Sequence, residues 1–187
     1  MIEFKNMPAR LNRALQVRTA DRLRASLARD PTSGLPVVDA LSDDDERELR
    51  EVGGGRLAAV VFCIERVVDR ARSSSEVHEG QCLATREAAH LIGGQVRRTD
   101  LLGWFAADAL VILAPGLDRV SAQALAERLG HLFADRRLAV GDPHAHLRVN
   151  IGVAFRSAAS PAGWTALTLV QEAERNASNL SSIAIVA

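Results

Sequence analysis

The sequence of 187 residues contains little cysteine, almost no lysine and no long apolar run. Its two cysteines, Cys63 and Cys82, are too far apart for a CxxC metal or redox motif, and we expect buried thiols in a reducing compartment. No apolar signal-peptide core is found near the N-terminus. The longest apolar run, 57–64, is too short to cross a membrane. These absences predict a cytoplasmic protein, without a membrane span in this chain.

The charges of the chain cancel, with 23 lysines and arginines against 23 aspartates and glutamates. This balance argues against binding to a nucleic-acid polymer through bulk electrostatics. Lys5 is the only lysine, so nearly all positive charge belongs to arginine, which suits bidentate recognition of guanine and phosphate. Hydrophobic residues make up 48% of the chain and charged residues 25%, which predicts a folded domain with a sizeable core.

The first expected element is an amphipathic helix over residues 9–29. Its leucines recur at spacings of four and eight, with arginines between them: Leu11, Leu15, Leu23 and Leu27. Such a helix either packs on the domain that follows or pairs with its copy in a dimer, and the sequence leaves both open. Two prolines and a glycine end it in DPTSGLP, 30–36. We therefore expect a connecting helix, 1–29, and a domain, 30–187, and we expect the chain to be part of a longer protein.

The rest of the chain alternates between helical and strand-like patterns. Helices are expected at 37–52, with a cap at Ser42, and at 81–92, 118–134 and 165–178. Strands are expected at 56–66, 101–105, 109–113, 147–155 and 183–186. This order predicts an α+β fold in which helices pack on a sheet.

Four stretches carry a family resemblance. They read DPTSGLPVVDAL from Asp30, VVFCIERV from Val60, RRTDLLGWFAADALVILAP from Arg97 and LRVNIGVA from Leu147. In this order they resemble the DxLTGLPNRRAL, DIDxF, RxxDxxxRxGGDEFxxxLP and VTxSIGVA motifs of the GGDEF domain of diguanylate cyclases, which condense two GTP molecules into cyclic di-GMP. The resemblance implies a nucleotidyl-cyclase-like α+β sheet flanked by helices, preceded here by the connecting helix.

The motif that names the family is altered in this chain. The turn reads AADAL where the family has Gly-Gly-Asp/Glu-Glu-Phe. The resemblance implies that the glycines let the backbone approach the nucleotide, and that the acidic residues hold magnesium. Here Ala106 and Ala107 replace the glycines, Ala109 lacks a carboxylate, and Asp108 alone could bind the metal.

Other family positions are also altered. The second metal ligand aligns with Cys63, whose thiol suits magnesium poorly, while Glu65 keeps a neighbouring acidic place. The guanine-reading residues of the family fall near Ala71 and Gln81, and the catalytic lysine of the last helix is absent from AERNAS, 173–178. We predict a degenerate GGDEF domain that is not an enzyme and has no metal site and no cofactor.

An RxxD box stands five residues before the altered turn, at the spacing that the family uses to bind its product at an inhibitory site. The family's second arginine of that site matches Arg128, in an AER segment of the following helix. An arginine fork fits O6 and N7 of guanine, and a carboxylate accepts from its N1–H and N2–H₂. We predict that Arg97, Asp100 and Arg128 bind cyclic di-GMP. Arg98 and Trp104 are further candidates, and Trp104 either packs in its strand or stacks on a base.

The predicted function is therefore a non-catalytic receptor for cyclic di-GMP that signals to a partner or an attached domain. In the family this ligand often binds as a stacked pair that bridges two domains, which implies a homodimer promoted by ligand. One alternative is a pseudoenzyme that acts as a dimerisation or protein-interaction module without binding nucleotide. Another is a regulator that binds GTP with magnesium through Asp108 and Glu65.

Overall fold

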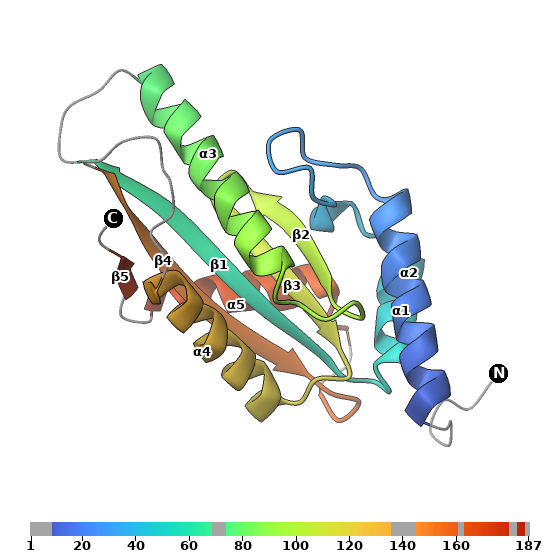
Figure 1. Ribbon diagram of the computed structural model, residues 1–187. Coiled ribbons are helices and arrows are strands. Elements are labelled where there is room, and N and C mark those ends of the chain that lie inside the picture. Colours follow the sequence, from blue (N-terminus) through green and yellow to red (C-terminus); the bar gives the residue numbers. More distant parts are fainter. Residues whose placement is uncertain (1–8, 69–73, 136–144, 161–162, 180–182, 186–187) are drawn as a thin grey trace.

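The structure is a computed structural model that describes residues 9–68, 74–135, 145–160, 163–179 and 183–185. Figure 1 shows a twisted sheet with α3 and α4 on one face, α5 on the other, and α1 and α2 at one side. None of the described helices is long and apolar enough to cross a membrane.

The sheet has five strands in the order β2-β3-β1-β4-β5, and every neighbouring pair is antiparallel. The strands are β1 (Leu57–Val68), β2 (Leu101–Ala106), β3 (Ala109–Pro115), β4 (Ala145–Arg156) and β5 (Ile183–Ile185). The longer helices are α1 (Ala9–Ser26), α2 (Asp43–Val52), α3 (Ser74–Gly93), α4 (Arg119–Asp135) and α5 (Ala166–Asn179), with a 3-10 turn, η2, at Val38–Ala40.

The central strand β1 is apolar on both faces because both faces are covered. Val60, Phe62 and Ile64 pack in the core toward α3 and α4. Ala59 and Val61 pack in a second core toward α1, α2 and α5. Since successive side chains of a strand point to opposite faces, an uninterrupted apolar run is what a strand between two layers of helices requires.

Two glycines allow close approaches that position the outer elements. A Cβ on Gly152 would lie 1.9 Å from the Ala173 carbonyl oxygen, so α5 packs directly on the backbone of β4. A Cβ on Gly103 would lie 2.2 Å from Cγ2 of Val38. The segment before η2 therefore lies against β2, where the Trp104 N–H donates to the Pro36 carbonyl at 2.8 Å.

The helix α1 packs on its own domain, the first of the two arrangements that the sequence left open. Leu23 in α1 and Leu27 just after its end are buried, whereas Leu11 remains 52% exposed. Arg22 donates to Asp45 and Glu48 of α2, at 2.9 and 2.5 Å. Further hydrogen bonds from α1 to α2 come from Gln16 and Thr19.

Two of the predicted helices have wrong boundaries. The helix predicted at 37–52 is a 3-10 turn followed by α2, because Ser42 and Asp45 form a capping box that starts the helix after Ser42. The helix predicted at 81–92 begins at Ser74, since polar residues on an exposed helix face resemble a loop in sequence. The predicted helix 9–29 ends at Ser26, and the other predicted elements agree with the structure within about two residues.

Candidate functional site

The RxxD box forms a tight turn immediately before β2, and Asp100 braces it from inside. Its Oδ2 accepts from the backbone N–H of Arg97 at 3.1 Å, and its Oδ1 accepts from the Thr99 hydroxyl at 3.2 Å. The Asp100 N–H in turn donates to the Arg97 carbonyl at 3.0 Å. Asp100 is 1% exposed, so its carboxylate holds the turn and does not project from the surface.

Burial also changes the electrostatics of Asp100. Desolvation raises the pKa of its carboxyl group, against the hydrogen bonds from Arg97 and Thr99 and the positive charges of Arg97 and Arg24. A guanine base could donate to this carboxylate only if Asp100 gave up the hydrogen bonds that define the turn.

Arg97 and Arg128 converge on one hollow beside the box. Both are exposed, and they come from the turn before β2 and from α4. The hollow has a volume of about 260 Å³, and its lining consists of Arg97, Leu117, Ser121, Ala124, Leu125 and Arg128. Arg128 donates to the Gln95 carbonyl at 3.1 Å, which ties α4 to the loop that leads into the box. The structure thus brings Arg97 and Arg128 to one hollow, whereas Asp100 is buried in the turn and does not line it.

Arg97 also borders two further hollows, so the surface around the box is strongly cationic. One hollow, of about 380 Å³, lies between α1 and the box, and its charged lining residues are Arg24, Arg29, Arg97 and Arg98. The other, of about 340 Å³, adds Arg56 to the same surface. No hydrogen bond or ion pair within the described ranges engages the Arg97 guanidinium. A chain with no net charge therefore concentrates arginine around one turn.

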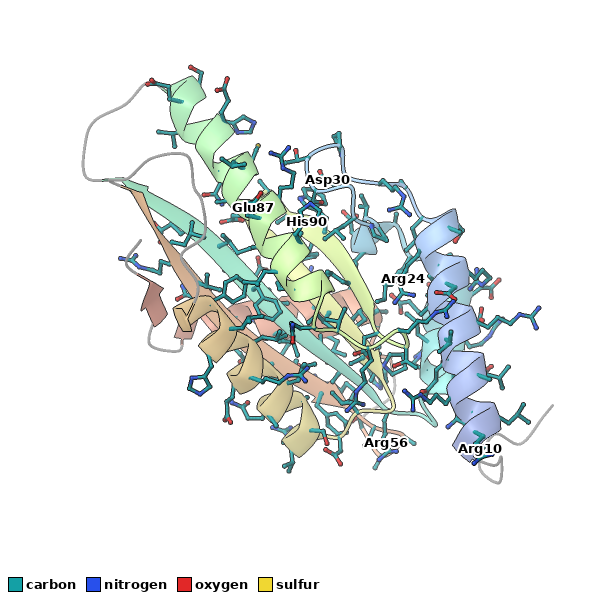
Figure 2. All side chains as sticks on the ribbon, viewed as in Figure 1. Arg10, Arg24, Asp30, Arg56, Glu87 and His90 are labelled. Carbon is teal, nitrogen blue, oxygen red and sulfur yellow. The ribbon has the colours of Figure 1, made fainter. Side chains whose placement is uncertain are left out.

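The second arginine of the box is held by α1. Arg98 forms an ion pair with Asp21 at 2.9 Å, and Asp21 also pairs with Arg24 at 2.8 Å. Arg24 donates to the carbonyls of Arg98, at 3.0 Å, and Asp100, at 2.5 Å. Figure 2 shows Arg24 on the side of α1 that faces the sheet. The sequence pattern missed Asp21 and Arg24, because both read there only as the polar side of an amphipathic helix.

Trp104 is half-buried and packs against the core that lies toward α3 and α4. Its backbone forms a bridge with Val37 beside β2. In this arrangement the indole ring belongs to the strand's packing.

The altered GGDEF turn closes the β2–β3 hairpin without glycine. Ala107 and Asp108 are exposed at its tip, and no described residue other than glycine has a positive φ. Favoured two-residue hairpin turns need positive φ, so the strands adjust instead: the pairing register shifts between Trp104 and Ala106. The Asp108 carbonyl accepts from the Ile64 N–H at 2.7 Å, which fixes the turn against β1.

The remaining positions of the predicted degenerate active site do not fit a magnesium ion. Cys63 lies opposite Ala109 in the β1–β3 pairing, and burial, together with the carboxylates of Glu174 and Asp108, raises the pKa of its thiol to about 11. The thiol therefore stays protonated near neutral pH. Glu65 forms a cross-strand ion pair with Arg148 at 3.1 Å.

Of the two positions that match the family's guanine-reading residues, the structure describes only Gln81. Gln81 donates to the Ile64 carbonyl at 2.5 Å, and Ala71 lies outside the described residues. In the part of the chain that the structure describes, no group of three His, Cys, Asp or Glu side chains could hold a metal ion.

Two larger hollows, each of about 440 Å³, lie beside β4 and contain none of the predicted residues. In one of them Asn176 donates to the Val153 carbonyl at 2.8 Å. Glu172 of the same hollow pairs with Arg156, which lines the other hollow. Size alone therefore does not identify the site, and the arrangement of charge around the RxxD box is the more specific feature.

No family model matches the sequence, and no curated protein matches it. Solved structures do match. The GGDEF domain of FimX from Pseudomonas aeruginosa is 19% identical, with 81% of this chain and 91% of that chain covered and a TM-score of 0.58. The diguanylate cyclase SiaD of the same organism, solved with its activator SiaC, is 20% identical, with 91% and 64% covered and a TM-score of 0.63.

The coiled coil and GGDEF domain of DgcB from Caulobacter crescentus, solved in complex with cyclic di-GMP, is 17% identical to this chain. It covers 90% of this chain and 85% of its own, with a TM-score of 0.54. Likeness at such identities establishes the fold. The chain has the α+β fold of GGDEF domains, as its sequence motifs predicted.

Proposed function

We propose that this chain is a non-catalytic receptor domain that binds cyclic di-GMP at the RxxD box and passes the signal to a partner or an attached domain. The observation that carries the proposal is the convergence of Arg97 and Arg128 on one hollow, beside a turn braced by Asp100. Cyclic di-GMP offers two guanine edges and two phosphates, and both are groups that arginine forks bind in a bidentate manner.

The three residues have different roles in this proposal. Arg97 extends from the turn with a guanidinium free of ion pairs among the described residues, so it can take a guanine edge or a phosphate without losing a partner. Arg128 supplies a second positive charge from α4. Asp100 fixes the backbone that presents Arg97. It could accept a hydrogen bond from the base only by giving up its hydrogen bonds to the Arg97 N–H and the Thr99 hydroxyl.

The non-catalytic part of the proposal rests on the altered turn and its neighbours. Ala109 offers no carboxylate, the Cys63 thiol stays protonated, and Glu65 is engaged by Arg148. Magnesium binds hard oxygen ligands, and this set provides few of them. Support for the ligand also comes from DgcB, a GGDEF neighbour that was solved in complex with cyclic di-GMP.

Calorimetric titration of cyclic di-GMP tests the proposal. We expect a Kd in the micromolar range or tighter, or about 8 kcal/mol of binding free energy. Arg97→Ala and Arg128→Ala should each weaken binding at least about tenfold, or about 1.4 kcal/mol. The matched control is Arg47→Ala, an exposed arginine on α2 that pairs with Asp44 away from the box, and it should bind as the wild type does. An equal loss in all three variants, or no heat with the wild type, would overturn the proposal.

A second candidate function, dimerisation without nucleotide, is favoured by one observation: Leu11 is 52% exposed near the start of α1. An exposed leucine on an amphipathic helix can pair with its copy. Light scattering with and without cyclic di-GMP separates the candidates. A dimer that forms without ligand and is lost in Leu11→Glu supports the interaction module, and a dimer that needs ligand supports the receptor.

A further inference from the structure

We infer that α1 contributes to the ligand site through two positioning residues, Asp21 and Arg24, which hold the RxxD turn in place. Ligand binding and docking of α1 on the domain therefore stabilise each other. The inference rests on the proposed function for its ligand, whereas the clamp itself is independent of any ligand and can be tested without one.

The clamp begins with the Arg24 guanidinium, which joins three acceptors. It donates to the carboxylate of Asp21 in its own helix at 2.8 Å. It also donates to the carbonyls of Arg98 at 3.0 Å and Asp100 at 2.5 Å, which lie 74 and 76 positions away in the sequence. Both carbonyls belong to the box, so one side chain of α1 fixes the backbone conformation that presents Arg97.

A second contact reinforces the first. Asp21 accepts from Arg98 at 2.9 Å through Oδ2, while its Oδ1 accepts from Arg24. One carboxylate therefore bridges an arginine of the helix and an arginine of the box. Because Arg24 is partly shielded and hydrogen-bonded to the backbone, this network has more positional order than an isolated surface ion pair.

The charge around the clamp gives the direction of the coupling. The hollow between α1 and the box is lined by four arginines, and Asp21 is the carboxylate that pairs with two of them. Their mutual repulsion opposes the docked arrangement. A ligand with two phosphates placed beside Arg97 would relieve that repulsion, so its binding favours docked α1, and docked α1 favours its binding.

A separate set of contacts on the same helix provides the control. Arg22, two residues before Arg24, pairs with Asp45 and Glu48 of α2, and among the described residues no hydrogen bond or ion pair joins it to the box. Loss of Arg22 should loosen α1 from α2, whereas loss of Arg24 should loosen the box. The two arginines therefore separate a clamp on the ligand site from docking of the helix in general.

The experiment measures hydrogen exchange and cyclic di-GMP affinity on the full chain, with Arg24→Met and with Arg22→Met as control. Without ligand, amides of 98–102 should exchange faster in Arg24→Met and at the wild-type rate in Arg22→Met. Affinity should fall at least tenfold in Arg24→Met and less than threefold in Arg22→Met. Saturating ligand should slow the exchange of amides 20–26 in the wild type.

In Arg24 one nitrogen, Nη1, donates to Asp21 while the other, Nη2, donates to both carbonyls of the box. Arg24→Lys keeps the charge but replaces this planar fork with a single ammonium nitrogen, so we expect it to stay weakened. If Arg24→Lys restored wild-type affinity and wild-type exchange of the box, positive charge alone would explain the effect of Arg24. That result would overturn its positioning role. Equal effects of Arg22→Met and Arg24→Met would also overturn it, as would unchanged exchange of the box in Arg24→Met. If the box loosens in Arg24→Met but the wild type binds no cyclic di-GMP, the clamp stands and the proposed ligand fails.

Discussion

The guanidinium of Arg24 donates to the carbonyl of Asp100 at 2.5 Å, across 76 positions of sequence. This contact joins the connecting helix to the box that the sequence motifs assign to ligand binding. Under the proposed function, ligand binding acts through a change of contacts, and α1 contacts both the box and α2. If the proposed function holds, a partner or an attached domain would respond to a change in the position of α1.

Asp100→Asn tests the buried carboxylate, because it keeps the shape of the side chain and removes its titration. Burial raises the folded-state pKa of Asp100 above 3.8, the pKa of an unperturbed aspartate, so the folded state binds this proton more readily than the unfolded chain. The free energy of unfolding of the wild type, relative to the variant, should therefore fall as the pH rises from 3.8 through the raised pKa. Urea unfolding of both proteins across this range measures the difference. A difference that grows with pH would show that the neighbouring arginines outweigh burial.

Gly152→Ala tests the packing of α5 on β4. A Cβ at Gly152 would lie 1.9 Å from the Ala173 carbonyl and 2.3 Å from the Ala177 nitrogen, and both atoms are backbone, which cannot rotate away. We expect a loss of about 3 kcal/mol in the free energy of unfolding. Gly93→Ala is the matched control, since its nearest neighbour would be Cδ2 of Leu102 at an ordinary 3.8 Å. Similar urea midpoints for the two variants would contradict this packing.

The thiol of Cys63 should react slowly. Burial first, and then the carboxylates of Glu174 and Asp108, raise its pKa to about 11, so little thiolate forms at pH 8. In a Cys82→Ser variant, where Cys63 is the only cysteine, alkylation by iodoacetamide at pH 8 should be at least about tenfold slower than that of free glutathione, whose thiol is unperturbed. The rate should climb only as the pH approaches 11. Fast labelling at pH 8 would show that the thiol is neither desolvated nor held protonated.

Much of the fold could be predicted because its signals are local. The apolar run of β1, the two halves of the β2–β3 hairpin and the last helix, α5, each show their own periodicity. The family resemblance then indicated how these elements assemble into one sheet with helices. The start of α3 at Ser74 was missed, since a polar helix face with few apolar positions has no periodicity to detect.

The candidate site was predictable only in part, because some of its contacts join residues far apart in the sequence. Arg97 and Arg128 follow from motif spacing, and the structure places them at one hollow. The burial of Asp100 and its anchoring by Arg24 depend on contacts between elements far apart in sequence, which no local pattern reports. The outward carboxylate that guanine recognition suggested is instead a brace within the turn.

The predicted degeneracy of the active site can be tested by introducing the carboxylates that the family motif has at Cys63 and Ala109. Cys63 and Ala109 are cross-strand neighbours, so Cys63→Asp with Ala109→Glu would place two carboxylates side by side on one face of the sheet. These carboxylates repel one another until a cation binds between them, and hard oxygen ligands suit magnesium. If the double variant binds magnesium with a Kd of about 1 mM, then 10 mM magnesium stabilises it by about 1.4 kcal/mol, which raises Tm by roughly 3–6 °C.

The wild type and each single variant should show no such shift, and none of the four proteins should convert GTP with magnesium into cyclic di-GMP. The double variant still lacks the catalytic lysine of the family in AERNAS, and it keeps Ala106 and Ala107 in the turn, so regained metal binding should not regain turnover. A magnesium-dependent rise in the Tm of the wild type would show that Asp108 and its neighbours already bind the ion. Formation of cyclic di-GMP by the wild type would contradict the proposal that the chain is non-catalytic.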